Sequence, residues 1–218
     1  TRLVLQNALL FAARWATPFK AEETEKGAQF TLADGSSSTA DLMTDTNAYP
    51  LVTGTGWRAL RLPYTGGAGS SNLAMDVILP DNVVSPADLP ASTWGEATAA
   101  LTAATAEQQV ALKLPKLDLA SGVMDLFPVL TAMGVELGSL DHIAEDIDAD
   151  QAAQQVRLIV DEEGTVAAAL TEIGVVAAAA PDSSSSVEFT VDHPYVLRIV
   201  DLTSGVAIIE AAILNPAG

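Results

Sequence analysis

Residues 161–171 read DEEGTVAAALT, and this stretch decides how the rest of the chain is interpreted. It follows an apolar, strand-like run at residues 156–160 and leads into a segment with four alanines, Pro181 and four serines. Gly164 provides a pivot, because a residue without a Cβ adopts backbone conformations that other residues avoid. The stretch is therefore a segment that can exchange its structural partners.

Two structures remain open for this stretch from its residues alone. Glutamate and alanine favour a helix, so an exposed helix is one of them. The other is a strand that slides into an existing sheet, where bulky side chains would be costly through overpacking. On such a strand every second residue shares one face, and that face consists of small residues: Thr165, Ala167, Ala169 and Thr171.

Composition excludes several classes of partner. The chain has 218 residues, of which 49% are hydrophobic, and a net charge of -18. Binding to phosphates or to an anionic membrane surface needs a basic face, so we expect neither a nucleic-acid nor a membrane partner.

No apolar run reaches the roughly 18 residues of a membrane span. There is no cysteine, which excludes disulfides and thiolate chemistry, and no signal peptide is recognisable at Thr1.

Strand patterns dominate the chain. Residues 3–12 predict a buried strand that Arg14 and Trp15 follow and end. The remaining strands are expected in pairs or singly: residues 29–32 with 39–43, 57–62 with 73–79, 110–114, 117–119, 156–160, 189–191, and 195–200 with 206–214. Helical spacing marks residues 85–104 and 123–133. The sequence therefore predicts an α+β fold with mostly antiparallel strands and a few helices.

No residue pattern supports an enzyme. Only His142 and His193 could act as imidazole bases, and no Gly-x-Ser-x-Gly motif is present. Residues 146–150 resemble the start of a calcium loop, but Gln151 and Arg157 replace the required glycine and glutamate. We therefore expect no metal, no cofactor and a solvated acidic loop at residues 146–150.

Several motifs, in order along the chain, resemble the serpin family. They are LVLQNA at 3–8, LRLPY at 60–64, MDVILP at 75–80, LKLPK at 112–116, the stretch 161–169, the FTVDHPY block at 189–195 and LNP at 214–216. The resemblance runs essentially from end to end but covers only the carboxy-terminal half or so of a serpin. It implies a single partial serpin domain over residues 1–218, either a fragment or a natural truncation, whose amino-terminal helices are missing.

The resemblance implies an inhibitor that is consumed as a suicide substrate. A serine protease attacks the exposed loop, expected at about residues 172–188, and the hinge at residues 161–171 then inserts into the main sheet. Closing strands occupy residues 189–216. The hinge roles fall on Glu162, Glu163, Gly164, Thr165, Ala167, Ala168 and Ala169. Trp15 takes the tryptophan position at the top of the sheet, and Asn7 faces Gln154 at its centre, where the family often has histidine.

Family spacing places the attacked bond near Ala178 and Ala179, with Ala177 as a further candidate. A small residue there suits an elastase-like or subtilisin-like serine protease, and no Arg or Lys for a trypsin-like one lies between Arg157 and Arg198. The missing amino-terminal part of the same serpin is a second expected partner. The family habit predicts an extracellular location, and the low lysine and high alanine content predicts a bacterial source. A non-inhibitory or truncated structural or binding module is the alternative.

Overall fold

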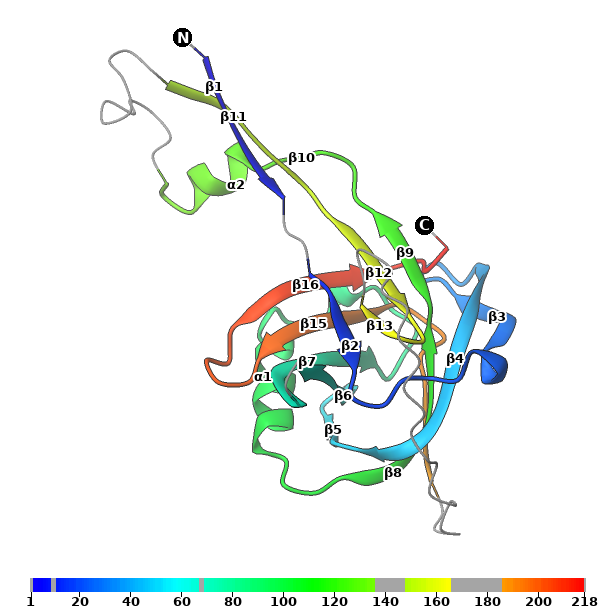
Figure 1. The fold of residues 1–218 in the computed structure, drawn as a ribbon. Coiled ribbons are helices and arrows are strands. Elements are labelled where there is room, and N and C mark those ends of the chain that lie inside the picture. The colour runs from blue at the N-terminus through cyan, green and yellow to red at the C-terminus, as the bar shows by residue number, and fades with distance from the viewer. Residues whose placement is uncertain (1, 9–10, 67–68, 136–147, 166–185, 218) are drawn as a thin grey trace.

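The computed structural model describes residues 2–8, 11–66, 69–135, 148–165 and 186–217 (Figure 1). Within these residues the chain forms three sheets, most of whose strand pairs are antiparallel, and two short α-helices. This architecture confirms the predicted α+β class. The sheets meet in one body, and the N-terminal strand runs away from it (Figure 1).

The largest sheet has nine strands among the described residues. In spatial order they are β16 (Ala207–Ile213), β15 (Tyr195–Asp201), β7 (Gly69–Pro80), β6 (Trp57–Gly66), β2 (Ala13–Trp15), β13 (Gly164–Thr165), β12 (Arg157–Asp161) and β9 (Leu117–Ala120), with β5 (Leu51–Gly54) paired to β6. All of its pairings are antiparallel. The sheet thus joins strands from both ends of the chain around β13.

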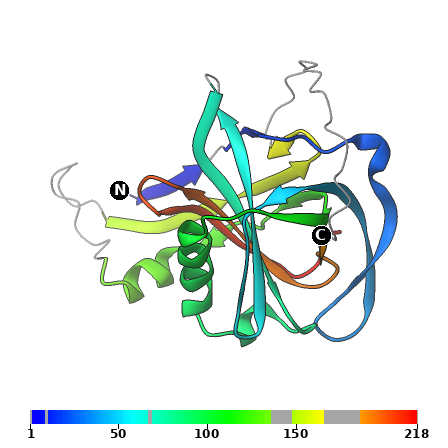
Figure 2. The same cartoon turned by 90° about the horizontal axis from the view of Figure 1, so that it is seen from below.

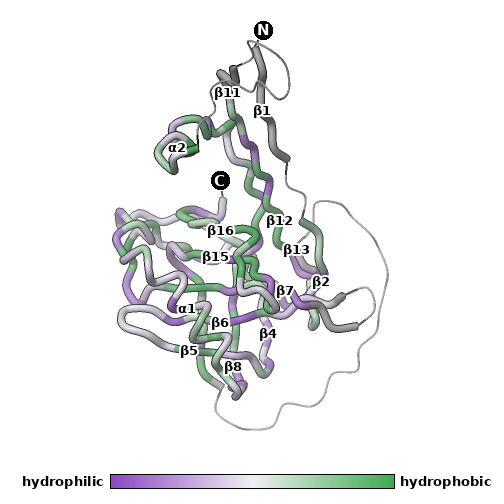
Figure 3. Tube along the Cα trace, turned by 90° about the vertical axis from the view of Figure 1, so that its left-hand side faces the viewer, coloured by the Kyte–Doolittle hydropathy of each residue, from purple (hydrophilic) through white to green (hydrophobic). Residues whose placement is uncertain are grey.

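Two smaller sheets complete the fold. The first consists of β1 (Arg2–Ala8), β11 (Asp148–Gln155) and β10 (Met124–Asp125), and β1 runs parallel to β11. Together with α2 (Phe127–Ala132) it extends beyond the body (Figure 3). The second consists of β14 (Val187–Thr190), β8 (Gln108–Pro115), β4 (Ser37–Tyr49) and β3 (Glu25–Thr31).

The helix α1 (Ser92–Ala103) packs against β5, β6 and β7 (Figure 2). Two single turns of 3₁₀ helix lie at Ala21–Glu23 and Pro86–Asp88. Ala97 and Leu101 of α1 are buried against Trp57, Ile78 and Val196 of the sheet. A larger apolar cluster fills the space between the nine-stranded and four-stranded sheets, with Phe30, Leu60 and Phe189 fully buried.

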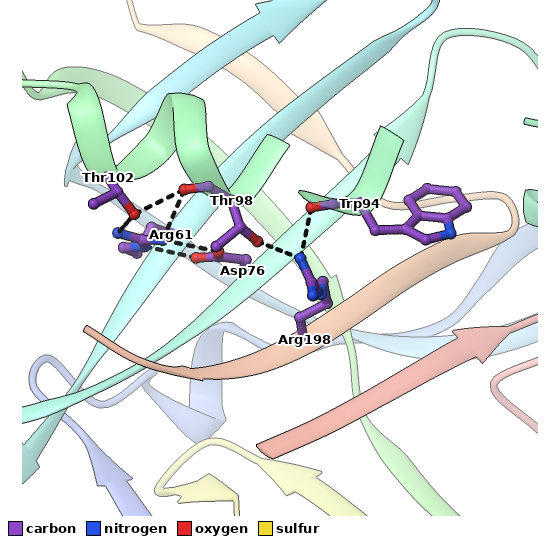
Figure 4. Close-up of polar contacts among 6 residues, drawn as sticks. All are labelled: Arg61, Asp76, Trp94, Thr98, Thr102 and Arg198. Carbon is purple, nitrogen blue, oxygen red and sulfur yellow. Dashed lines mark hydrogen bonds and ion pairs between the residues drawn. The ribbon is translucent and has the colours of Figure 1, made fainter. Parts of the chain in front are cut away.

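Buried charges also fasten α1 to the sheet (Figure 4). Arg61 of β6 donates from Nε and Nη2 to the two carboxylate oxygens of Asp76 on β7, at 2.6 and 2.9 Å. Its Nη1 reaches Thr102 Oγ1 at 3.3 Å, and Nη2 also reaches the Thr98 carbonyl at 3.4 Å. Because Asp76 is completely buried, the pair can persist only with this full set of partners.

A second arginine extends the same network from β15 (Figure 4). Arg198 donates from Nη1 to the Trp94 carbonyl at 2.6 Å and to Thr98 Oγ1 at 2.8 Å. Its Nε lies 2.7 Å from Glu210 Oε2 on β16. The two arginines thus connect four strands, β6, β7, β15 and β16, to the helix α1.

Four predicted elements differ from the structure. Ala13–Trp15 continues as a strand, because β2 pairs with both β6 and β13. The acidic loop expected at residues 146–150 is wrong from Asp148 onward, since β11 lies between β1 and β10 there. The helix expected over residues 123–133 is confined to α2. The helix expected over residues 85–104 begins only at Ser92, after the 3₁₀ turn.

Candidate functional site

The site centres on β13, the two-residue strand at the start of the hinge. Gly164 pairs with Asp161 of β12 on one side and with Arg14 of β2 on the other. Thr165 pairs with Val160 and with Ala13 in the same way. Gly164 and Thr165, which the family resemblance assigns to the hinge, therefore lie inside the nine-stranded sheet, antiparallel to both neighbours (Figure 1).

A tight turn feeds the chain from β12 into β13. The Asp161 side chain accepts hydrogen bonds from the backbone amides of Glu163 at 3.0 Å and Gly164 at 3.2 Å. A short acidic side chain that satisfies amides two and three residues later stabilises a reversal of the chain. The acidic residue at the start of the hinge thus sets the direction in which the hinge enters the sheet.

Gly164 is required by the space at this position. An added Cβ would lie 2.2 Å from the Ala13 carbonyl oxygen and 2.8 Å from the Arg14 Cα. Its φ of 155° is also a conformation that other residues rarely adopt. The glycine therefore permits β2 and β13 to approach, in addition to the pivot expected from the sequence.

Thr165 and Tyr64 meet inside the sheet. Their hydroxyl oxygens lie 2.7 Å apart, and the exposed fractions of the two residues are 2% and 1%. Burial raises the pKa of the Tyr64 hydroxyl, which therefore stays protonated at any physiological pH. The Tyr64 ring stacks on Trp15, with centroids 4.8 Å apart, and meets the edge of Phe11 at 5.3 Å.

Trp15 holds the turn through its backbone and its ring. Its amide donates to the Glu163 carbonyl at 3.0 Å, and its indole Nε1 donates to the Asp161 carbonyl at 2.9 Å. The Phe19 amide donates to the remaining carbonyl, that of Glu162, at 2.9 Å. The residue expected at the top of the sheet thus contacts the turn that starts the hinge.

Glu162 places a carboxylate between two other parts of the fold. Its Oε2 lies 2.5 Å from Lys116 Nζ and its Oε1 accepts from the Thr24 hydroxyl at 2.8 Å. Burial works toward a higher pKa of this carboxyl, but the hydrogen bonds from Lys116, its own backbone amide and Thr24 outweigh burial and lower the pKa. The carboxylate is therefore the form that the folded site favours.

The remaining predicted site residues fall into two groups. Asn7 of β1 and Gln154 of β11 are opposite each other in the register of the parallel pair. Residues Ala167, Ala168, Ala169, Ala177, Ala178 and Ala179 lie outside the described residues. Glu163 has an exposed side chain and contributes its backbone to the turn.

Sequence reasoning missed three partners of the hinge: Thr24, Tyr64 and Lys116. Tyr64 and Lys116 belong to the LRLPY and LKLPK motifs. These motifs indicated the family but not a contact of either residue with the hinge. Thr24 carried no signal, because nothing local links it to a residue 138 positions away.

The described part of the chain offers little for catalysis or metal binding. His193 is buried, and its ring nitrogens lie 2.7 Å from the Asp192 carboxylate and from the Pro80 carbonyl. No group of three or more His, Cys, Asp or Glu residues is placed to hold a metal ion in the described segments. Among these segments no helix is long and apolar enough to cross a membrane. The described site holds the two-residue strand β13 between β2 and β12.

Comparisons with known proteins agree with this architecture. The family described as Serpin (serine protease inhibitor) matches residues 1–216. Serpin-Z2B of Triticum aestivum is 31% identical over 229 residues, which cover 99% of this chain and 56% of the relative. Serpin-ZX of Hordeum vulgare is 29% identical, with 99% of this chain and 57% of the relative covered. The chain therefore spans little more than half the length of these relatives.

Solved structures show the same fold. A serpin from the trematode Schistosoma haematobium superposes with a TM-score of 0.73 at 21% identity, covering 94% of this chain and 55% of that one. Human thyroxine-binding globulin in complex with thyroxine gives a TM-score of 0.74 at 20% identity, covering 94% of this chain and 54% of that one. At such identities the likeness concerns the arrangement of the strands.

Proposed function

Because the chain belongs to the serpin family, we propose that it inhibits serine proteases as a suicide substrate. The observation that carries the proposal is β13: Gly164 and Thr165 lie as a strand between β2 and β12. A hinge whose first residues are accepted by the sheet has a defined path for further insertion. The chain covers just over half of its curated relatives, so this activity is proposed for the protein to which these residues belong.

The reaction begins with an ordinary proteolytic attack. The serine oxygen of the protease adds to the carbonyl carbon of an alanine among Ala177, Ala178 and Ala179, and an ester forms as the peptide C–N bond breaks. The nitrogen leaves with a proton as a new amino terminus. The hinge then extends β13 into the sheet and carries the ester-linked protease with it before water can hydrolyse the ester.

The pattern of the hinge supports this insertion. Thr165 points into the buried interior, where its side chain is 2% exposed. Because side chains alternate along a strand, Ala167, Ala169 and Thr171 would follow it on the same face. Each is small, and none is charged or a proline, so the interior can accept them without severe overpacking.

The target follows from the residues of the loop. A protease with a shallow pocket, elastase-like or subtilisin-like, accepts alanine at the attacked position. No Arg or Lys stands between Arg157 and Arg198 to engage a trypsin-like pocket. We propose an extracellular setting, where serpins commonly meet such proteases.

The second candidate is a non-inhibitory module with a serpin fold. The pairing of β1 with β11 favours it, because insertion beyond Thr165 requires these two strands to separate. Such a module would be cleaved at the loop as a plain substrate, with hydrolysis of the ester faster than any insertion.

Denaturing gel electrophoresis separates the two candidates. The protein is mixed with an elastase-like protease, both as the 218-residue chain and with any further residues its gene encodes. A band of the combined mass that survives denaturation is expected from the inhibitor. Thr165→Arg places a cation where Thr165 is buried, so it should abolish this band and leave cleavage intact.

The matched control is Thr203→Arg in the exposed turn between β15 and β16, which should form the covalent band like the parent. Cleavage without a covalent band in every sample would exclude inhibition. A covalent band from Thr165→Arg as strong as that of the parent would contradict the proposed role of the hinge.

A further inference from the structure

We propose that the Tyr64 hydroxyl is a positioning group that keeps Gly164 and Thr165 in the sheet before any loop cleavage. The proposal concerns the resting position of the hinge. Its consequence for protease capture rests on the proposed function, whereas the position itself does not. Tyr64 would thereby set how readily the hinge leaves β2 and β12.

The contact is suited to this role because the two buried hydroxyls are hydrogen-bond partners of each other. Tyr64 Oη and Thr165 Oγ1 lie 2.7 Å apart, and either can be the donor. Tyr64 is 1% exposed and Thr165 is 2% exposed, so water does not reach the pair. The bond joins the side chain of a β13 residue to that of a β6 residue.

The tyrosine cannot follow Thr165 if the hinge moves. Its ring is stacked on Trp15 with an interplanar angle of 8°, and the edge contact with Phe11 restrains it from another side. Tyr64 and Trp15 are also paired residues of β6 and β2. The phenol therefore marks a fixed point, and only a hinge in the β13 position brings Thr165 to it.

Removal of one hydroxyl and removal of both have opposite consequences. A buried hydroxyl without a partner is unfavourable, whereas two apolar groups of similar shape in the same place are nearly neutral. Tyr64→Phe leaves Thr165 Oγ1 unpaired in the sheet, and Thr165→Val leaves Tyr64 Oη unpaired. Each single variant should therefore release the hinge, and the double variant should let it return.

Amide hydrogen exchange of residues 162–165 measures this release directly, on the longest form of the protein that its gene encodes. Each single variant should exchange these amides roughly tenfold to a hundredfold faster than the parent, as expected for one unsatisfied buried hydroxyl. The double variant Tyr64→Phe/Thr165→Val should return to within about threefold of the parent. Thr165→Ser keeps a hydroxyl and should behave as the parent does.

Tyr49→Phe is the matched control for the loss of a tyrosine hydroxyl. Tyr49 is buried, and its hydroxyl is bound to Asp45 on β4, away from the hinge. This variant should leave exchange at residues 162–165 unchanged. Parent-like exchange in both single variants would overturn the proposal. A double variant whose exchange rate rises by the product of the two single-variant increases would also overturn it.

Protease association tests the consequence separately. If the protein is an inhibitor, Tyr64→Phe should change the rate of covalent complex formation while Tyr49→Phe does not. The predicted exchange pattern without a covalent complex would support the role of Tyr64 and contradict the proposed function. A covalent complex without the predicted exchange pattern would support the proposed function and contradict the role of Tyr64.

Discussion

The Nζ atom of Lys116, at the junction of β8 and β9, lies 2.5 Å from Oε2 of Glu162 at the start of the hinge. These residues are 46 positions apart in the chain, and the Thr24 hydroxyl binds the other oxygen of the same carboxylate. One acidic side chain thus connects the turn after β12 to two separate parts of the body. The charge state of Glu162 therefore controls how firmly the turn is held.

We predict that this site loses stability in acid. The pKa of Glu162 is lower in the folded protein than its ordinary value of 4.5. A group with a lowered pKa contributes stability that is complete above its unfolded-state pKa and is lost as the pH falls through its folded-state pKa. Glu162→Gln should therefore unfold more easily than the parent at neutral pH, with a difference that shrinks below pH 4.5.

Denaturant unfolding at a series of pH values gives this comparison. The control is Glu163→Gln, because Glu163 is adjacent and its side chain is exposed. A constant free-energy difference between Glu162→Gln and the parent across the acid range would contradict the prediction.

Gly164→Ala should expel β13 from the sheet. Its Cβ would lie 2.2 Å from the Ala13 carbonyl oxygen, which is a backbone atom and cannot rotate away. We expect a loss of about 1–3 kcal/mol, as for other strained backbone positions, and faster amide exchange at Trp15, whose amide binds Glu163. Gly95→Ala in α1 meets nothing within 4 Å and should instead be neutral or stabilise by about 0.5–1 kcal/mol.

Asp76→Asn should be among the most destabilising single changes in the body. It leaves the Arg61 guanidinium buried without its counterion, and breaking one partner of a buried pair typically costs about 3–5 kcal/mol. Asp118→Asn removes a partner of the exposed Arg157 and should cost no more than about 1 kcal/mol. Chemical denaturation of the two variants checks this contrast, and equal midpoints would refute it.

Trp15→Phe should weaken the turn while leaving the body folded. The phenylalanine keeps an aromatic ring against Tyr64 but loses the Nε1 donor to the Asp161 carbonyl. We expect a loss of about 1–3 kcal/mol in the free energy of unfolding, from the unpaired carbonyl and the smaller ring. Trp94→Phe is the control, because Trp94 contacts Arg198 through its backbone carbonyl, and its denaturation midpoint should change less.

Sequence patterns predicted what depends on neighbouring residues. The hairpins β3–β4, β6–β7 and β15–β16 were expected from alternation and from their turns, and all three are confirmed. For the hinge, the residues left helix and strand open, and Gly164 and Thr165 are a strand. The decision comes from β2 and β12 on either side, which no local pattern contains.

The contacts of the hinge could not be predicted from the sequence for the same reason. Tyr64 and Thr165 are 101 positions apart, and Trp15 and Asp161 are 146 positions apart. Local propensity carries no information about such pairs, whereas strand register brings them together. β11 shows the converse, because a polar sequence forms a strand once β1 and β10 provide its hydrogen bonds.

The position of β13 also determines how many strand pairs are parallel and how many are antiparallel. In the chain before β2 and β12, the strands β1 and β11 share one parallel ladder that runs from the Arg2–Asp148 pair to the Ala8–Gln155 pair. At β13 itself the chain makes two antiparallel ladders, one with each neighbour. Each further residue that followed Thr165 inward would exchange one parallel rung for two antiparallel ones, and antiparallel pairing is slightly the stronger per residue. Under the proposed mechanism, the seam between β1 and β11 is therefore the place where the sheets would gain hydrogen-bonded rungs.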